Sequence, residues 1–412
     1  MKQREMIEKA AEFIRNHSTA DDFTLHIGMT ASHKTRFAQN AITQHINGDT
    51  TSVSFNAVFD GKNGHAAVNN LDEDALLFAV KTAESMAKLN EPDPEHVPSE
   101  GSSSLPTICN YAEATAKLEV EQMVDTIVQC VDNAKTRQAK VAGMTEKKAR
   151  LSYMATGNGF EGFDENTSFS HSMTLSGTDR ETSISRSLKD VSRFNLNKEI
   201  EQLNRQFDSL VNKKVSEKGK CNVILRPQAV AGLFQYLFWM MNRRNADEGI
   251  TPYTNQIKKH FFGDAFSLHS VTDDTDLLCS PFTSSGLPAK QLPLINKGVI
   301  ENMPMQRYWA TKVGESPAEP QNMYIPGDSV SEEEMLRIVG NGLIVNRFWY
   351  IRFVDRKRGE LTGLTRDGVL AFENGAITQS VNNLRWNEIP HEVSRRILAS
   401  GLSTVLDTRM KV

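Results

Sequence analysis

Cysteine is scarce in this sequence of 412 residues: the four that occur, at positions 109, 130, 221 and 279, lie far apart and form no Cys-x-x-Cys pair. This pattern argues against a disulfide scaffold and a zinc ribbon, and is typical of a reducing compartment. The sequence also lacks any apolar run of the ~18–20 residues that a membrane-spanning helix needs. Its first residues, MKQREMIEKAAEFIRNH, have no apolar core like that of a secretory signal. We therefore expect a cytoplasmic protein.

An excess of charge of one sign is also missing. Lysine and arginine total 47 against 51 aspartates and glutamates, and the net charge is -4. The densest basic cluster, Asp355-Arg356-Lys357-Arg358, contains its own acid. Proteins that bind nucleic acids usually carry a clear basic patch, so nucleic acid is not expected as a partner. With 39% hydrophobic and 24% charged residues, the composition is that of an ordinary globular protein.

Periodic patterns predict helices segregated from strands. Val53, Phe55, Ala57 and Phe59 recur at period two before the turn residues Asp60-Gly61, which predicts a strand and a hairpin. Helical spacing and strand-like runs elsewhere in the first half predict helices over 2–16, 72–88, 112–138 and 197–213, and strands over 141–154, 167–175 and 182–190. The Pro-, Ser- and Glu-rich residues 90–106 predict a loop within the N-terminal domain.

The second half begins after the polar stretch NKKVSEKGKCNVIL, residues 212–225, which predicts a boundary between domains 1–215 and 216–412. Ser331 and Glu334 fit a helical capping box, and residues 343–354 predict a long strand. Asn374-Gly375 is a strong hairpin signal. The absence of a strand-helix-strand rhythm favours an α+β fold of two domains, with antiparallel sheets and segregated helices.

Three candidate motifs can be weighed on the residues alone. GNGFEG, residues 157–162, matches a dinucleotide fingerprint, but a strand pattern follows where a helix is required. His391-Glu392 lacks the second histidine of a zinc helix, and Arg395 and Arg396, which would repel a cation, occupy the next turn. We therefore expect neither a nucleotide site nor a zinc site at these two motifs.

The segment from residue 260 to residue 274 contains two histidines and three aspartates. Of these, His260, His269 and Asp273 are the candidate ligands for zinc or manganese. Turn formation and hydrogen bonding explain the same residues, so metal binding here is the weaker alternative.

The most apolar stretch is LRPQAVAGLFQYLFWMM, residues 225–241. A proline at its start and hydrophobic residues nearly all round predict one buried helix of about four turns. No catalytic group is visible in it.

Three longer segments, in this order, resemble the TldD/PmbA (TldE) family. They are TRFAQNAITQHINGDTTSVSFNAVFDGKNGHAAVNNLDEDAL, DLLCSPFTSSGLPAKQLPLINKGVIENM, and NGLIVNRF followed by RGELTGLTRDGVLAFENGAITQSVNNL. The resemblance runs from roughly residue 5 to residue 390. It implies a dimer of two-domain α+β chains that acts in cytoplasmic proteolysis of peptides or unfolded proteins. The family also carries the historical description "modulator of DNA gyrase".

Within this family, TldD-type members are zinc metallopeptidases with a His-Glu-x-x-x-His helix and a cysteine ligand near the C-terminus. TldE/PmbA-type members lack these residues. Aligning Pro227 with the proline before that helix places Gln235 and Met240 at the histidines and Tyr236 at the glutamate. The last cysteine, Cys279, lies well before the C-terminal hairpin.

The resemblance therefore implies a TldE/PmbA-like chain with no catalytic residue, no metal and no cofactor of its own. It would pair with itself or with a TldD-type zinc subunit. Two alternatives remain open: a stand-alone peptide-binding or scaffolding protein, and an enzyme with an unorthodox metal site around His260–Asp274.

Overall fold

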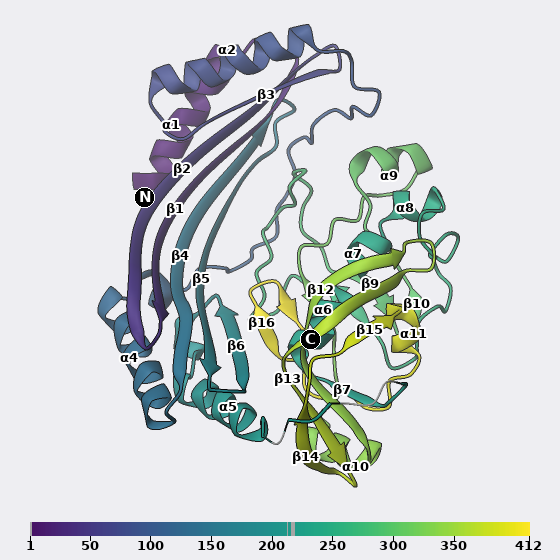
Figure 1. Cartoon of the computed structure of the whole chain (residues 1–412). Coiled ribbons are helices and arrows are strands. Elements are labelled where there is room, and N and C mark those ends of the chain that lie inside the picture. Colours follow the sequence, from purple (N-terminus) through teal and green to yellow (C-terminus); the bar gives the residue numbers. More distant parts are fainter. Residues whose placement is uncertain (1, 212, 216–218) are drawn as a thin grey trace.

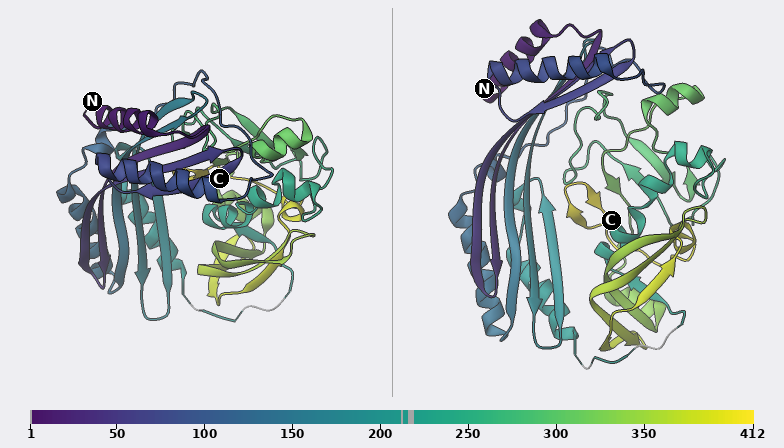
Figure 2. Two further views of the ribbon diagram at one scale, coloured as in Figure 1. Left: turned by 90° about the horizontal axis from the view of Figure 1, so that it is seen from above. Right: turned by 45° about the horizontal axis from the view of Figure 1, so that its top comes forward.

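The computed structural model describes residues 2–211, 213–215 and 219–412, and its N-terminal half is built on one long sheet (Figure 1). The sheet is six-stranded and antiparallel throughout. In spatial order its strands are β3 (Lys62–Val68), β2 (Ala41–Phe59), β1 (Asp22–Ala38), β4 (Lys140–Thr156), β5 (Glu161–Ser176) and β6 (Glu181–Leu188). The long strands curve, and their concave side faces the C-terminal half (Figures 1 and 2).

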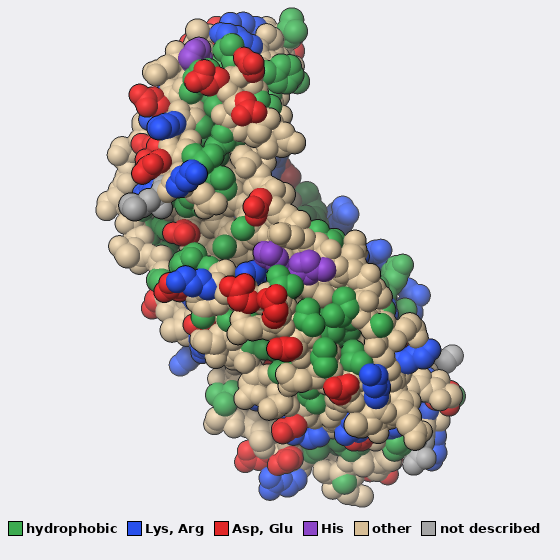
Figure 3. Space-filling view, turned by 90° about the vertical axis from the view of Figure 1, so that its left-hand side faces the viewer, with side chains coloured by type: hydrophobic (Ala, Val, Ile, Leu, Met, Phe, Trp, Pro, Cys, Tyr) green, Lys and Arg blue, Asp and Glu red, His purple; other side chains and the backbone are tan. Residues whose placement is uncertain are grey.

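Strict alternation along the strands explains why helices cover one face of this sheet. In β5, Phe169, His171 and Met173 are buried, whereas the serines between them are half-exposed. The buried face packs against helices at both ends of the sheet. On this side of the molecule, the solvent-facing surface carries a mixture of acidic and basic side chains (Figure 3). The helices of this half are α1 (Lys2–His17), α2 (Glu73–Leu89), α3 (Glu113–Ala116), α4 (Val120–Thr136), the 3₁₀ turn η1 (Val191–Arg193) and α5 (Leu196–Ser209).

The C-terminal half contains two smaller sheets. The first has the order β14-β13-β12-β7, with β15 also paired to β13, and comprises β7 (Val223–Leu225), β12 (Gly342–Asp355), β13 (Glu360–Glu373), β14 (Ala376–Val381) and β15 (Arg385–Glu388). The second has the order β10-β9-β8-β11-β17-β16 and comprises β8 (Leu268–Ser270), β9 (Leu292–Asn296), β10 (Val299–Ile300), β11 (Met323–Tyr324), β16 (Val405–Asp407) and β17 (Met410–Lys411).

The helices of the C-terminal half pack between and around these sheets. They are α6 (Pro227–Phe234), α7 (Leu237–Met240), α8 (Arg243–Asp247), α9 (Arg307–Val313), α10 (Glu332–Val339) and α11 (Pro390–Ser394). One continuous core contains Leu233 and Leu237 of the first two helices together with Phe266 of the loop before β8 and Leu294 of β9. Within the part of the chain that the structure describes, no helix has the length and apolar character to cross a membrane.

The predicted α+β class with segregated helices is confirmed. Two short parallel pairs, β7 with β12 and β11 with β17, join the antiparallel ones. The hairpins at Asp60-Gly61 and Asn374-Gly375 are also confirmed, and all four residues have positive φ, as a type I′ turn requires.

Two predictions concern boundaries: the extent of the helix over 112–138 and the border between the two domains. The single helix predicted over 112–138 is wrong: it is interrupted at residues 117–119, because the Glu119 side chain and that of Gln122 form a capping box that starts α4 afresh. The predicted domain boundary between residues 215 and 216 lies between α5 and β7 but falls next to residues 216–218, outside the described ranges, so it stays a prediction.

The loop 90–106, which we assigned to the N-terminal domain, bridges the two halves. Its Glu95 forms a bidentate ion pair with Arg244 of α8, with both N–O distances at 2.9 Å. Glu100 pairs with Arg307 of α9 at 2.5 Å. Nearby, Phe160 packs edge-on against Phe282 with ring centroids 5.3 Å apart. The chain therefore fixes the long sheet to the C-terminal half at several points.

A buried histidine lies in the core of the long sheet. His171 is 2% exposed; Thr145 Oγ1 lies 2.8 Å from its Nδ1 and Cys130 Sγ 3.7 Å from its Nε2. Burial lowers the pKa of His171 to about 4 and raises that of the Cys130 thiol to about 12. Both side chains are therefore neutral at physiological pH.

We predict an acid-side loss of stability from His171. Its folded pKa of about 4 lies below the unfolded value near ~6.5, so protons bind the unfolded chain first. The contribution is complete above the unfolded pKa and falls, as the pH drops toward 4, by up to about 1.4 kcal/mol per pH unit. Urea unfolding of wild type and His171→Phe across this window measures it. The variant should show a shallower slope, and part of the remainder is due to His391, whose pKa burial also lowers to about 4, and to other groups with lowered pKa values such as His26 and Asp274. Equal slopes would contradict the assignment.

Candidate functional site

The apolar stretch of residues 225–241 forms two short helices that pack on β12. It leaves β7, which runs parallel to β12, and enters α6 with Pro227 in the first turn. Gly232 faces the sheet, and a Cβ at this position would make ordinary van der Waals contact, at 3.6 Å, with Phe348 Cβ and Ile351 Cδ1. The β7–α6 connection thus positions the next residues against the middle of β12.

The expectation of one continuous, buried helix is wrong in two respects. The helix is interrupted at Gln235 and Tyr236 and resumes as α7. The two parts pack on different partners: the Phe234 ring contacts that of Phe266, with centroids 4.5 Å apart, whereas the Trp239 ring contacts that of Phe353, with centroids 4.9 Å apart. In addition, Gln235 is exposed and Trp239 is 38% exposed, so one side of the segment faces solvent.

The three positions that match the family's zinc helix lie in three different environments. The Gln235 side chain is exposed, and its Nε2 donates to Gly232 O of its own helix at 3.3 Å. The Tyr236 hydroxyl donates to the main-chain oxygen of Ile351 in β12 at 3.0 Å. Met240 is completely buried, and its Sδ lies 3.2 Å from the position that a Cβ would occupy if Gly359 carried a side chain.

These side chains do not fit a zinc ion. Zinc in proteins is held by histidine, cysteine, aspartate or glutamate, whereas an amide, a phenol and a thioether are poor ligands for it. Tyr236 cannot replace the glutamate as a base either, since its hydroxyl already donates its proton to the main-chain oxygen of Ile351 in β12. Within residues 2–211, 213–215 and 219–412, no group of three or more His, Cys, Asp or Glu side chains could hold a metal ion.

Cys279, the last cysteine, has a structural environment. It is buried, and burial raises the pKa of its thiol to about 11, which disfavours the thiolate that a metal requires. Its main-chain oxygen accepts a hydrogen bond of 2.7 Å from Asn110 Nδ2 of the N-terminal half. Cys279 thus lies at the junction of the two halves.

The weaker metal candidate is dispersed among separate partners. His260 Nε2 pairs with Asp264 at 2.5 Å on an exposed turn. His269 is half-buried on β8, and burial lowers its pKa. Asp273 accepts a hydrogen bond from Gln291, and Asp274 pairs with Lys411 at 2.7 Å. Proximity along the sequence therefore does not gather these residues into a ligand set.

The other two motifs have structural roles. GNGFEG connects β4 to β5, so a strand follows it, as we expected. His391 is buried in α11 beside Phe261, and Glu392 pairs with Arg395 at 2.6 Å.

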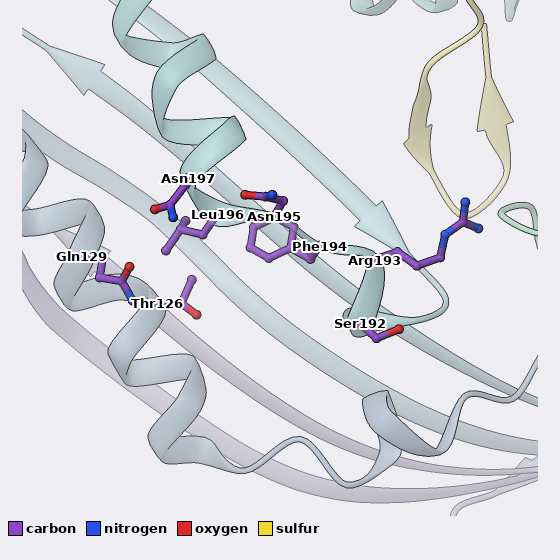
Figure 4. Close-up of a pocket in the computed structure, with 8 residues that line it drawn as sticks. All are labelled: Thr126, Gln129, Ser192, Arg193, Phe194, Asn195, Leu196 and Asn197. Carbon is purple, nitrogen blue, oxygen red and sulfur yellow. The ribbon is translucent and has the colours of Figure 1, made fainter.

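A pocket that sequence reasoning missed lies between α4 and the segment leading into α5 (Figure 4). Its volume is about 490 Å³, and its lining residues are Thr126, Gln129, Ser192, Arg193, Phe194, Asn195, Leu196 and Asn197. The one titratable side chain in this lining, Arg193, forms an ion pair with Asp276. The lining thus supplies no acid–base pair for catalysis.

The C-terminal half of the chain matches a known protein family. Residues 218–411 match the family described as "PmbA/TldA metallopeptidase C-terminal domain". The C-terminal half of the chain, residues 218–411, belongs to the TldD/PmbA family. Among the curated proteins, none matches this sequence significantly.

Solved structures of this family share the whole fold. TldE from Thermococcus kodakarensis superimposes with a TM-score of 0.90 at 16% identity, over 98% of this chain and 96% of that one. A proposed modulator of a DNA gyrase from Thermotoga maritima gives 0.86 at 17% identity, over 99% and 97%. A similarly described protein from Bacteroides thetaiotaomicron gives 0.87 at 14% identity, over 100% and 96%. At these identities the likeness establishes the fold and leaves the activity to the residues of this chain.

Proposed function

We propose that this TldD/PmbA chain is the non-catalytic, TldE-type subunit of a TldD/TldE-type cytoplasmic metallopeptidase complex that acts on peptides or unfolded proteins. The observation that supports this most is the environment of Gln235, Tyr236 and Met240. Tyr236 binds β12, Met240 is buried in the core, and the exposed Gln235 donates to its own helix. Together the three side chains offer neither a set of metal ligands nor a general base.

The contribution of such a subunit would be shape and binding surface. The long sheet curves beside the C-terminal half, and the bridges at Glu95 and Glu100 hold the two together. A rigid chain of this kind can complete a chamber around a partner's active site without supplying chemistry. The metal and the base would both come from a TldD-type zinc subunit.

The test is reconstitution with the TldD-type chain encoded in the same genome. Each chain alone and the purified pair are incubated with an unstructured peptide, with and without a zinc chelator. We expect no hydrolysis by this chain alone, and hydrolysis by the pair that the chelator abolishes. Gln235→Ala, on the exposed position, should leave the activity of the pair unchanged. Chelator-sensitive hydrolysis by this chain alone would contradict the proposal. Failure of the two chains to associate would favour the stand-alone peptide-binding alternative.

A further inference from the structure

One face of the β12–β13–β15 ribbon carries exposed aromatic and arginine side chains. The opposite face is buried: Phe348, Ile351 and Phe353 pack toward α6 and α7. We call the outer one the arginine–aromatic face, and it consists of Arg347, Trp349, Tyr350, Arg352 and Val354 of β12, Leu364 and Arg366 of β13, and Arg385 of β15. Trp349 is 40%, Tyr350 62%, Val354 53% and Leu364 41% exposed.

This composition is that of a protein interface. Tryptophan, tyrosine and arginine are the side chains that most often dominate binding energy, and an ordinary exposed strand carries few of them together. Arg347 and Arg366 lie against the Trp349 ring, at 5.3 and 4.6 Å from its centroid. Arg352 lies 5.4 Å from that of Tyr350. The rings are thus held in place before any partner binds, which lowers the entropic cost of association.

The backbone at Tyr350 is a second, independent signal. The register of β12 against β13 shifts between Trp349 and Arg352, and Tyr350 has a φ of 53° in this bulge. Glycine or asparagine adopts this left-handed conformation far more easily than tyrosine does. A strained residue that leaves its aromatic ring in solvent gains little for the fold, which points to a use outside the fold.

Charge decides between possible occupants. The face holds four guanidinium groups, and two of them pair with the buried carboxylate of Asp367, which lies 2.5 Å from Arg347 Nε and 3.6 Å from Arg366 Nε. The nearby Glu360 is paired with Arg358 at 3.2 Å. Pairing of this face with its own copy across a twofold axis would oppose arginine to arginine. The occupant must therefore be a different chain with carboxylates on its surface.

We propose that the arginine–aromatic face is the docking surface for the carboxylate-bearing surface of a different polypeptide, the zinc subunit of the complex. This rests on the proposed function. A polypeptide fits better than a single-stranded nucleic acid, because Trp349 and Tyr350 already stack with arginines of their own chain. Leu364 and Val354 add aliphatic surface that a base does not use.

The experiment measures the affinity of this full-length chain for the purified TldD-type subunit at low and high salt. Tyr350→Gly removes the ring and relieves the backbone, so we expect binding to weaken by about tenfold or more while the midpoint of thermal unfolding rises by about 1–3 °C. Arg352→Glu should weaken binding comparably at low salt and less at high salt. Matched controls are Phe78→Ala on α2, also 62% exposed, and Arg205→Glu on α5. Both should bind within about twofold of wild type, since interface energy is concentrated in few residues.

Each other outcome has a defined meaning. If wild type binds the zinc subunit and both face variants bind it equally well, the docking proposal is wrong and the proposed function stands. If wild type does not bind at all, both fall. The docking proposal also falls if Tyr350→Gly instead dissociates a homodimer of this chain, or abolishes binding of a single-stranded oligothymidine.

Discussion

Replacing Asp367 with alanine is expected to lower the free energy of unfolding by about 3–5 kcal/mol, because it removes a buried carboxylate and leaves two half-buried arginines without their partner. The Asp367 side chain is 3% exposed. Its carboxylate lies 2.5 Å from Arg347 Nε and accepts a hydrogen bond of 2.9 Å from Ser183 of β6. One carboxylate thus joins the C-terminal ribbon to the long N-terminal sheet.

The main chain of Asp367 strengthens the same junction. Its oxygen accepts hydrogen bonds from Thr182 Oγ1 at 3.2 Å and from Asn346 Nδ2 at 2.5 Å. Asn346 in turn accepts a bond of 2.5 Å from Arg226, the residue before α6. A polar chain therefore runs from the start of α6 to β6, and its central residue has a φ of 61° that alanine tolerates poorly.

Urea unfolding and limited proteolysis measure this effect. Asp367→Asn is the informative companion, since asparagine accepts the left-handed backbone and still accepts from Ser183, so it removes the charge alone and should cost less. Glu201→Ala breaks an ion pair with Arg205 whose side chains are 70% and 72% exposed. That control should change stability by less than about 1 kcal/mol. An Asp367→Ala variant as stable as this control would show that the junction is held elsewhere.

The local signals in the sequence predicted local structure well. Asn374-Gly375 and Asp60-Gly61 gave the two hairpins because only a few residues accept two successive left-handed positions. The alternation along residues 167–175 likewise predicted a strand, which the structure contains as part of β5. The break at Glu119 was missed, because a glutamate is not among the preferred residues at a helix N-cap and the helical spacing continues across it.

The contacts of the candidate site residues could not be predicted from the sequence. The resemblance located residues 235–240, yet the Tyr236 hydroxyl bonds a residue 115 positions away, and no spacing rule contains that contact. The same applies to Asp367, whose partner Ser183 lies 184 positions away. His260, His269 and Asp273, the weaker metal candidate, are neighbours in sequence, but the turn and β8 direct them to separate partners.

Rebuilding the zinc motif in this chain is expected to fail. In the triple variant Gln235→His, Tyr236→Glu, Met240→His, the third change places an imidazole at a completely buried position that now holds a thioether. The second removes the donor to Ile351 O and brings a carboxylate toward that oxygen. Unpaired polar groups of this kind each cost about 1–3 kcal/mol, so the triple variant should lose about 3 kcal/mol or more of its free energy of unfolding.

The measurement pairs urea unfolding with zinc content after dialysis against zinc and then buffer. Gln235→His alone is the matched control, and its exposed position predicts a change within about 0.5 kcal/mol. We expect the triple variant to be destabilised and to hold less than one zinc per chain, because its two new imidazoles lie one in solvent and one in the core. Retention of one zinc per chain with wild-type stability would mean that these positions can converge on a metal. The separation of Gln235, Tyr236 and Met240 into three environments would then be a consequence of their side chains and not of the backbone that carries them.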